Sequence, residues 1–219
     1  MQVSTERGFG FEELTFCRQN QQLAECREIL ARWSDFRKNR DPNAMIPAIT
    51  EFRRLHGTPC RRLDQLYCYM TALSDRGIED IMMIDTEDRT IVLSGADPVI
   101  MFSIQPLIHR VRQQGIVLTL RLYVRQPDEE INPILEQANG IPQNLYVFVS
   151  RKPDGHERSA AFIDTRTGKA QPMMTFYPEQ VDLMQGFAET FRQQQGMDIH
   201  LHRYVLECDV DERELLSRC

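Results

Sequence analysis

The sequence predicts an α+β protein in which N-terminal helices precede a mostly antiparallel sheet. Between Phe11 and Lys38 apolar residues recur at spacings of three and four, which is typical of an amphipathic helix or of two closely joined helices. After Gly77 the pattern changes to short runs rich in β-branched residues, separated by turn residues. No internal repeat and no long linker are apparent. We therefore expect one domain over residues 1–219, with a helical part at 1–56, a part at 57–206 that carries the candidate site, and an acidic tail at 207–219.

The elements follow in order along the chain. After the helix at 11–38 we expect a short helix at 43–55 and a third at 60–73, which Thr58 caps and Pro59 begins. The remaining elements are a hairpin at 81–84 and 90–93, a helix at 97–114, a strand at 116–125, a helix at 127–138, strands at 145–150, 158–164 and 172–176, a helix at 178–195 closed by Gly196, a strand at 199–206, and a solvated acidic end at 207–214.

The composition excludes several classes of protein. Hydrophobic residues make up 42% of the 219 residues and charged residues 26%, which is typical of a soluble globular chain and excludes a disordered one. The net charge of −6 argues against nucleic acid as the main partner. The apolar runs are too short for an integral membrane segment. The polar N-terminus lacks an apolar signal region, so we expect a cytoplasmic protein, or one secreted into a host cell without a cleavable signal peptide, with reduced cysteines.

Cys60 is the first candidate for chemistry. It stands at the start of the predicted helix at 60–73, where unpaired backbone donors and the helix dipole lower the pKa of a thiol, and Arg61 and Arg62 add positive charge. The alternative is a small buried cysteine that caps the helix. Cys68, farther along the same predicted helix among apolar residues, is expected to be structural.

His156 is the second candidate. It follows Gly155 and opens a predicted strand, and a turn at Thr167-Gly168-Lys169 leads to another strand that ends at Pro178. This order resembles the His-bearing sheet of papain-like cysteine hydrolases, of the compact type found among bacterial secreted effectors. The alternative is an exposed turn histidine.

The resemblance implies a papain-like fold and a role for three residues. Cys60 would be the nucleophile and His156 the general base, whose ordinary pKa suits proton exchange near neutral pH. Asp164 is the nearest carboxylate beyond Glu157 that could orient the imidazole. The chain departs from the family pattern in two places, because Tyr177 stands where the family has an orienting Asp or Asn before a proline, and no oxyanion-hole Gln precedes Cys60.

Two further patterns suggest other sites. His200 and His202 alternate on the last predicted strand, so both rings would lie on one face, as a two-ligand metal site requires; two polar residues on a solvent-facing strand are the commoner case. The segment from Arg27 to Arg62 holds nine basic residues against four acidic ones, which would attract an acidic partner, although a solvated helix face is the simpler interpretation. No phosphate-binding glycine loop is present, and we expect no cofactor.

The leading hypothesis is a thiol hydrolase or transferase acting on amide bonds of a protein substrate, as a cysteine protease, deamidase or acyltransferase would, in the manner of a bacterial virulence effector. The main alternative is a non-catalytic interaction protein that binds an acidic partner through its basic helical face. A metal-dependent enzyme that uses His200 and His202 is a third interpretation.

Overall fold

The N-terminal part of the chain contributes one long described helix. The computed structural model describes residues 17, 21–39, 62–73, 77–96, 100–101, 104–127, 131–153 and 155–217. Helix α2, Ala24–Asn39, overlaps the helix expected at 11–38 and buries Cys26 and Ile29. The helix expected at 43–55 and the candidate nucleophile Cys60 lie outside the described residues.

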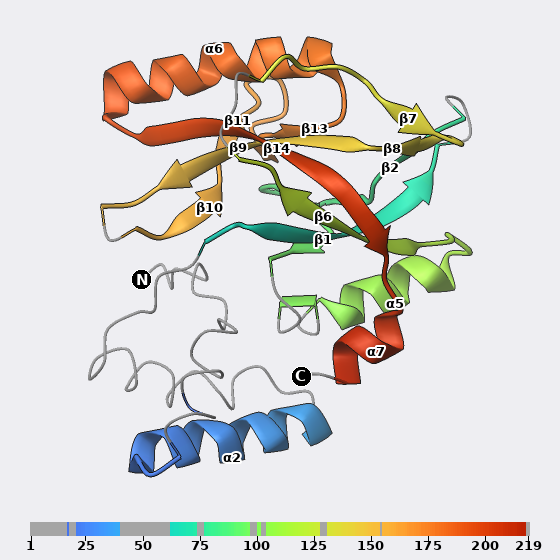
Figure 1. Cartoon of the computed structure of the whole chain (residues 1–219), viewed down its shortest axis with the longest axis vertical. Helices are drawn as coiled ribbons and strands as arrows, with labels where there is room; N and C mark the ends of the chain where they lie inside the picture. The colour runs from blue at the N-terminus through green and yellow to red at the C-terminus, as the bar shows by residue number, and fades with distance from the viewer. Residues whose placement is uncertain are drawn as a thin grey trace.

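The rest of the chain folds into two similar halves, which we call the first repeat (residues 65–125) and the second repeat (residues 144–209). Each has a long strand, a short strand, a hairpin, another short strand, a helix and a long closing strand (Figure 1). The first repeat contains β1 Gln65–Ala72, β2 Glu79–Ile81, β3 Met83–Asp85, β4 Thr90–Val92, β5 Ser94–Gly95, α5 Gln105–Gln113 and β6 Thr119–Arg125. The second repeat contains β9 Asn144–Arg151, β10 Glu157–Ser159, β11 Ala161–Ile163, β12 Ala170–Pro172, β13 Met174–Thr175, α6 Pro178–Gln195 and β14 Asp198–Asp209. Outside the repeats lie β7 Gln137–Ala138, β8 Ile141–Pro142 and α7 Glu212–Ser217.

The backbone hydrogen bonds of the two repeats match residue by residue. In each repeat three main-chain groups are linked in a ring, where the long strand, the start of the hairpin and the end of the hairpin meet. The bonds of the first ring are Met82 N to Tyr69 O (2.8 Å), Leu93 N to Met82 O (2.9 Å) and Tyr69 N to Leu93 O (2.9 Å). Those of the second are Ala160 N to Phe148 O (2.7 Å), Met173 N to Ala160 O (2.8 Å) and Phe148 N to Met173 O (2.9 Å).

The sequence also retains a trace of this repetition. The helix end and closing strand read Gln-Gln-Gly followed by Leu and Tyr-Val in both halves: Gln113, Gln114, Gly115, Leu120, Tyr123 and Val124 correspond to Gln194, Gln195, Gly196, Leu201, Tyr204 and Val205. Both glycines of this motif have positive φ, 79° and 62°, which a side chain would oppose. The expectation that the chain has no internal repeat is therefore wrong.

The two repeats join into one antiparallel sheet. Among the described residues its strand order is β10-β9-β14-β6-β1-β2, with β13 also paired to β9 and β5 to β1, so the order is symmetric about the β14–β6 pair. One face of this sheet encloses the central core, in which Tyr123 packs against Phe176 with ring centroids 5.7 Å apart. Helices α5 and α6 cover the opposite face near the two ends of the sheet (Figure 1). This arrangement confirms the α+β class.

Three expected elements are wrong. Residues 60–73 were expected to form a helix, but Gln65–Ala72 form β1, whose residues Leu66 to Met70 are buried on both faces. A strand buried on both sides is continuously apolar, so spacings of three and four arise in it by chance. Residues 131–136 of the helix expected at 127–138 have no regular structure and Gln137–Ala138 form β7. The acidic end is not a simple tail, because β14 continues to Asp209 and α7 follows.

Most of the other elements agree with expectation. The hairpin expected at 81–84 and 90–93 is present as β3 and β4, the strands expected at 116–125, 145–150 and 199–206 as β6, β9 and β14, and the helix expected at 178–195 as α6. The helix expected at 97–114 is represented by the shorter α5, and the strands expected at 158–164 and 172–176 are each divided into two short strands, β10 with β11 and β12 with β13. Gly196 closes α6 in the left-handed conformation, as expected of a glycine at a helix end.

Candidate functional site

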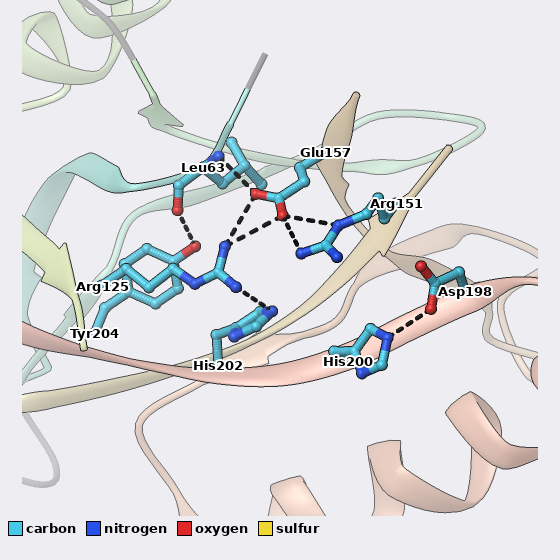
Figure 2. Close-up of polar contacts among 8 residues, drawn as sticks. All are labelled: Leu63, Arg125, Arg151, Glu157, Asp198, His200, His202 and Tyr204. Atoms are coloured by element: carbon cyan, nitrogen blue, oxygen red, sulfur yellow. Dashed lines mark hydrogen bonds and ion pairs between the residues drawn. The ribbon is translucent and has the colours of Figure 1, made fainter. Parts of the chain in front are cut away.

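Glu157 is the centre of a buried polar cluster at one end of the sheet. Only 4% of this residue is exposed. Its carboxylate accepts hydrogen bonds from Leu63 N at 3.0 Å, Arg125 Nη1 at 3.0 Å and Arg151 Nη2 at 2.9 Å (Figure 2). These donors come from the residues before β1, from the end of β6 and from the end of β9. The cluster therefore fastens the two repeats to each other.

The environment of Glu157 favours its ionised form. Burial acts to raise the pKa of this carboxyl group, but the backbone hydrogen bond from Leu63 and the charges and hydrogen bonds of Arg151 and Arg125 outweigh it. The net result is a pKa below the ordinary value of 4.5. Glu157 is consequently a fixed negative charge at neutral pH rather than a source of protons.

Arg125 connects this cluster to the last strand. Its Nη2 lies 2.8 Å from Nε2 of His202, which is 3% exposed (Figure 2). A guanidinium group only donates hydrogen bonds, so Nε2 of His202 is the acceptor in this contact. Next to it, the hydroxyl of Tyr204 donates to Leu63 O. These contacts hold the chain immediately before β1 against the second repeat.

The first repeat has a corresponding cluster with different side chains. Glu79 begins β2 as Glu157 begins β10, and Arg121 occupies the place of His202. Arg121, 4% exposed, binds Glu79 through Nε at 2.7 Å and also pairs with Asp209. Both clusters thus join strands that are distant in sequence, which identifies a structural role for each.

The structure describes two of the three candidate catalytic residues, His156 and Asp164. Cys60 lies outside the described residues. His156 is half-buried in the turn between β9 and β10, where its carbonyl oxygen accepts from Lys152 N at 2.8 Å. Asp164 lies at the tip of the β11–β12 hairpin and is engaged there, since it accepts from Arg166 N at 2.9 Å and Thr167 Oγ1 at 3.1 Å. The Arg166 backbone hydrogen bond is the main cause of a lowered pKa at Asp164.

Tyr177, which stands where papain-like hydrolases have Asp or Asn, makes a structural contact. It is buried and its hydroxyl donates to Asp80 Oδ2 at 3.2 Å, so it links the second repeat to β2. Cys68 is fully buried, as expected, and burial raises the pKa of its thiol.

His200 and His202 do share one face of β14, as expected, with ring centroids 6.3 Å apart. Their surroundings differ, because His202 is buried against Arg125 whereas His200 is exposed and lies 2.5 Å from Asp198 (Figure 2). Within the described residues no group of three or more His, Cys, Asp or Glu side chains is placed to hold a metal ion.

The basic segment from Arg27 to Arg62 is described only in part. Arg32 pairs with Glu28 on α2 at 2.9 Å, and Arg27 donates to the carbonyl oxygens of Gln21 and Gln22. These two arginines therefore stabilise their own helix. Most of the other basic residues of the segment lie outside the described residues.

A groove that the sequence analysis missed lies between the β3–β4 hairpin and α5. We call it the hairpin–helix groove. It encloses about 300 Å³ and its floor is apolar, with charged residues at the edges. Its lining residues are Met82, Met83, Ile84, Asp85, Leu107, Arg110, Val111 and Gln114.

The corresponding place in the second repeat is filled by aromatic rings. Strand register matches Ile84 to Phe162, and the ring that faces Phe162 is Phe187 of α6. The rings of Phe162 and Phe187 stack with centroids 4.4 Å apart and an interplanar angle of 9°. The two repeats thus share one backbone frame but differ in whether this groove is open. The repeated Gln-Gln-Gly motif was the sequence signal that could have led to this comparison.

Comparison with known proteins adds no relative. No protein-family model matches the chain, no curated protein matches it, and no solved structure matches it. In the part of the chain that the structure describes, no helix has the length and apolar character to cross a membrane.

Proposed function

We propose that the protein is an interaction module that binds a partner through the hairpin–helix groove. The observation that carries this proposal is the difference between the repeats: the groove beside α5 is open, whereas Phe162 and Phe187 fill the equivalent space beside α6. The second repeat has the same backbone arrangement and folds with this space filled. An open groove is therefore not required for the stability of the fold. An apolar concave site with a few polar groups at its edge is the usual form of a binding site.

The polar clusters support the same proposal. Glu157, Arg125 and His202 are engaged with one another and with Leu63, and Arg121 is engaged with Glu79 and Asp209. Buried networks of this kind fix the relative position of the elements that they join. They would hold the hairpin and α5 on a firm frame, which lowers the entropic cost of binding at the groove.

The thiol hydrolase with a papain-like site is the second candidate, and one contact favours it. Leu63 N binds the carboxylate of Glu157, the residue next to His156, so the chain shortly after Cys60 meets the chain beside His156. Three residues span at most about 11 Å, which leaves a sulfur-to-imidazole contact within reach. Against it, residues 65–72 form a strand, so the helix that was to lower the pKa of Cys60 is not found there.

The test of the interaction module is a selection from a random peptide library displayed on phage. Immobilised wild-type protein selects binders, and the double variant Ile84→Phe with Leu107→Phe, which adds two rings to the lining of the groove, is used for counter-selection. We expect enriched peptides that bind the wild type and lose at least about tenfold in affinity for the double variant, since an occupied groove excludes them. Val117→Phe, which adds a ring at a site 79% exposed and outside the groove, is the matched control and should bind the peptides normally.

Enriched peptides that bind the double variant as well as the wild type would contradict the proposal, and so would a selection without enrichment. A Cys60→Ala protein separates the two candidates. It should retain all peptide binding if the groove is the functional site. If selected peptides are instead cleaved or deamidated by water, and Cys60→Ala stops this reaction, the thiol hydrolase replaces the interaction module.

A further inference from the structure

We propose that the hairpin–helix groove takes an aromatic side chain from an acidic peptide segment, with a neighbouring carboxylate of that segment bound by Arg110. This inference rests on the proposed function and names the chemistry of the partner.

The filled counterpart indicates an aromatic occupant. The same arrangement of hairpin and helix in the second repeat accommodates the stacked rings of Phe162 and Phe187. In the first repeat the smaller side chains Ile84 and Leu107 leave a space of about 300 Å³ between the same elements. A planar ring entering it would lie between the hairpin wall and the helix wall, as the ring of Phe162 does beside α6. Removing such a ring from water supplies most of the affinity at a small site.

The charges at the edge of the groove favour an acidic segment. On the hairpin wall Asp85 is already engaged, since it accepts a hydrogen bond from Thr90 Oγ1 at 2.7 Å and lies 3.5 Å from Lys169 Nζ. On the helix wall Arg110 is exposed, and no carboxylate among the described residues pairs with it. The neighbouring Arg112 differs, because Glu212 binds it at 2.6 Å. Of the two charged residues that line the groove, Arg110 is therefore the one without a partner among the described residues, and its positive charge is the one a ligand would meet.

The second repeat lacks this charged edge. By the Gln-Gln-Gly motif Arg110 on α5 corresponds to Phe191 on α6, and by strand register Asp85 corresponds to Ile163. The repeat with the open groove is thus also the repeat that carries charges beside it. The ring would supply binding energy, and the contact with Arg110 would select the sequence around the ring.

The experiment uses three acetylated tripeptide amides: Asp-Phe-Asp, Lys-Phe-Lys and Asp-Ala-Asp. Each is titrated into the full chain with ¹³C-labelled methionine methyl groups, and the signals of Met82 and Met83, which line the groove, are followed. We expect Asp-Phe-Asp to shift both signals saturably and to bind about three- to tenfold more tightly than Lys-Phe-Lys. Asp-Ala-Asp should give no saturable shift.

Two variants locate the interaction. Arg110→Gln should reduce the preference for Asp-Phe-Asp to less than about twofold, and added salt should weaken the wild-type preference in the same direction. Lys152→Gln, which removes an exposed charge away from the groove, is the matched control and should leave the preference intact.

Equal binding of the two phenylalanine peptides, or a preference that survives Arg110→Gln, would overturn the acidic assignment while leaving the groove as a binding site. Equal binding of Asp-Ala-Asp would overturn the aromatic assignment. If neither the tripeptides nor any library peptide shifts Met82 and Met83, the proposed function fails together with this inference.

Discussion

Val124 of β6 and Val205 of β14 lie directly opposite each other at the centre of the sheet, and they occupy the same position in the two repeats. The neighbouring pairs are Tyr123 with Leu206 and Arg125 with Tyr204. Equivalent residues therefore exchange partners on either side of the two valines, so an approximate twofold axis passes between them. Equivalent positions have the same backbone environment, so the backbone does not explain why their side chains differ. Such differences indicate where a function has shaped the sequence.

The symmetry predicts matched effects of two tyrosine substitutions. The hydroxyl of Tyr123 donates to Pro142 O at 2.9 Å, and that of Tyr204 donates to Leu63 O, at equivalent places. Burial raises the pKa of both phenols, which agrees with hydroxyls that stay protonated donors. We expect Tyr123→Phe and Tyr204→Phe each to lower the free energy of unfolding by about 1–2 kcal/mol, and additively in the double variant. Urea denaturation measures these free energies. If one substitution were neutral and the other strongly destabilising, the two tyrosines would not be structurally equivalent.

Glu157 should control stability at acidic pH. Its pKa is lowered in the folded state, so it contributes stability above the ordinary value of 4.5, and this contribution is lost as the pH falls through the lower folded value. We expect Glu157→Gln to lower the free energy of unfolding at pH 7 by about 3 kcal/mol, because Arg125 and Arg151 lose their counter-charge. The difference from the wild type should shrink below pH 4.5.

The matched control for this carboxylate is Glu207→Gln at an exposed position of β14, which should change stability by less than about 0.5 kcal/mol. Urea titrations at several pH values compare the three proteins. A Glu157→Gln protein with wild-type stability at pH 7, or a difference that grows toward low pH, would show that the cluster does not fasten the repeats.

Thiol labelling distinguishes the proposed interaction module from the thiol hydrolase. Cys208 is exposed and Cys68 is fully buried with a raised thiol pKa, so they serve as the fast and slow references. Since an interaction module needs no activated thiol, we expect iodoacetamide at pH 7 to label Cys60 no faster than Cys208, and Cys68 much more slowly than either. Labelling of Cys60 about tenfold faster than Cys208, read by peptide mass spectrometry, would instead favour the hydrolase.

The sequence predicted the fold where local signals were strong. Helix α6 is framed by Pro178 and Gly196, and the hairpin around Asp85 is marked by turn residues, so both were found. The strand β1 was mistaken for a helix because its burial on both faces removes the alternation that identifies a strand. The duplication was missed because the repeats agree mainly in hydrogen bonding, which side-chain patterns record only weakly.

The candidate site is harder to predict from the sequence than the fold, because it depends on contacts between distant parts of the chain. His156 was singled out by its turn, but the residue that holds the structure there is its neighbour Glu157, whose donors come from three separate segments. The hairpin–helix groove is defined by the absence of large side chains at Ile84 and Leu107, and a smaller apolar residue gives no signal by itself. It becomes visible only against its filled counterpart.

Filling the hairpin–helix groove in the first repeat, and removing the two stacked rings in the second, tests the central claim most directly. N-acetyl-phenylalanine amide is titrated into the wild type, into Ile84→Phe with Leu107→Phe, and into Phe162→Ile with Phe187→Leu, and the methionine methyl signals of both repeats are followed. We predict that the probe shifts Met82 and Met83 in the wild type, loses this effect in the first variant, and gains a site beside Met173 and Met184 in the second. Unchanged shifts at Met82 and Met83 in the filled variant would contradict the assignment of the groove as the binding site.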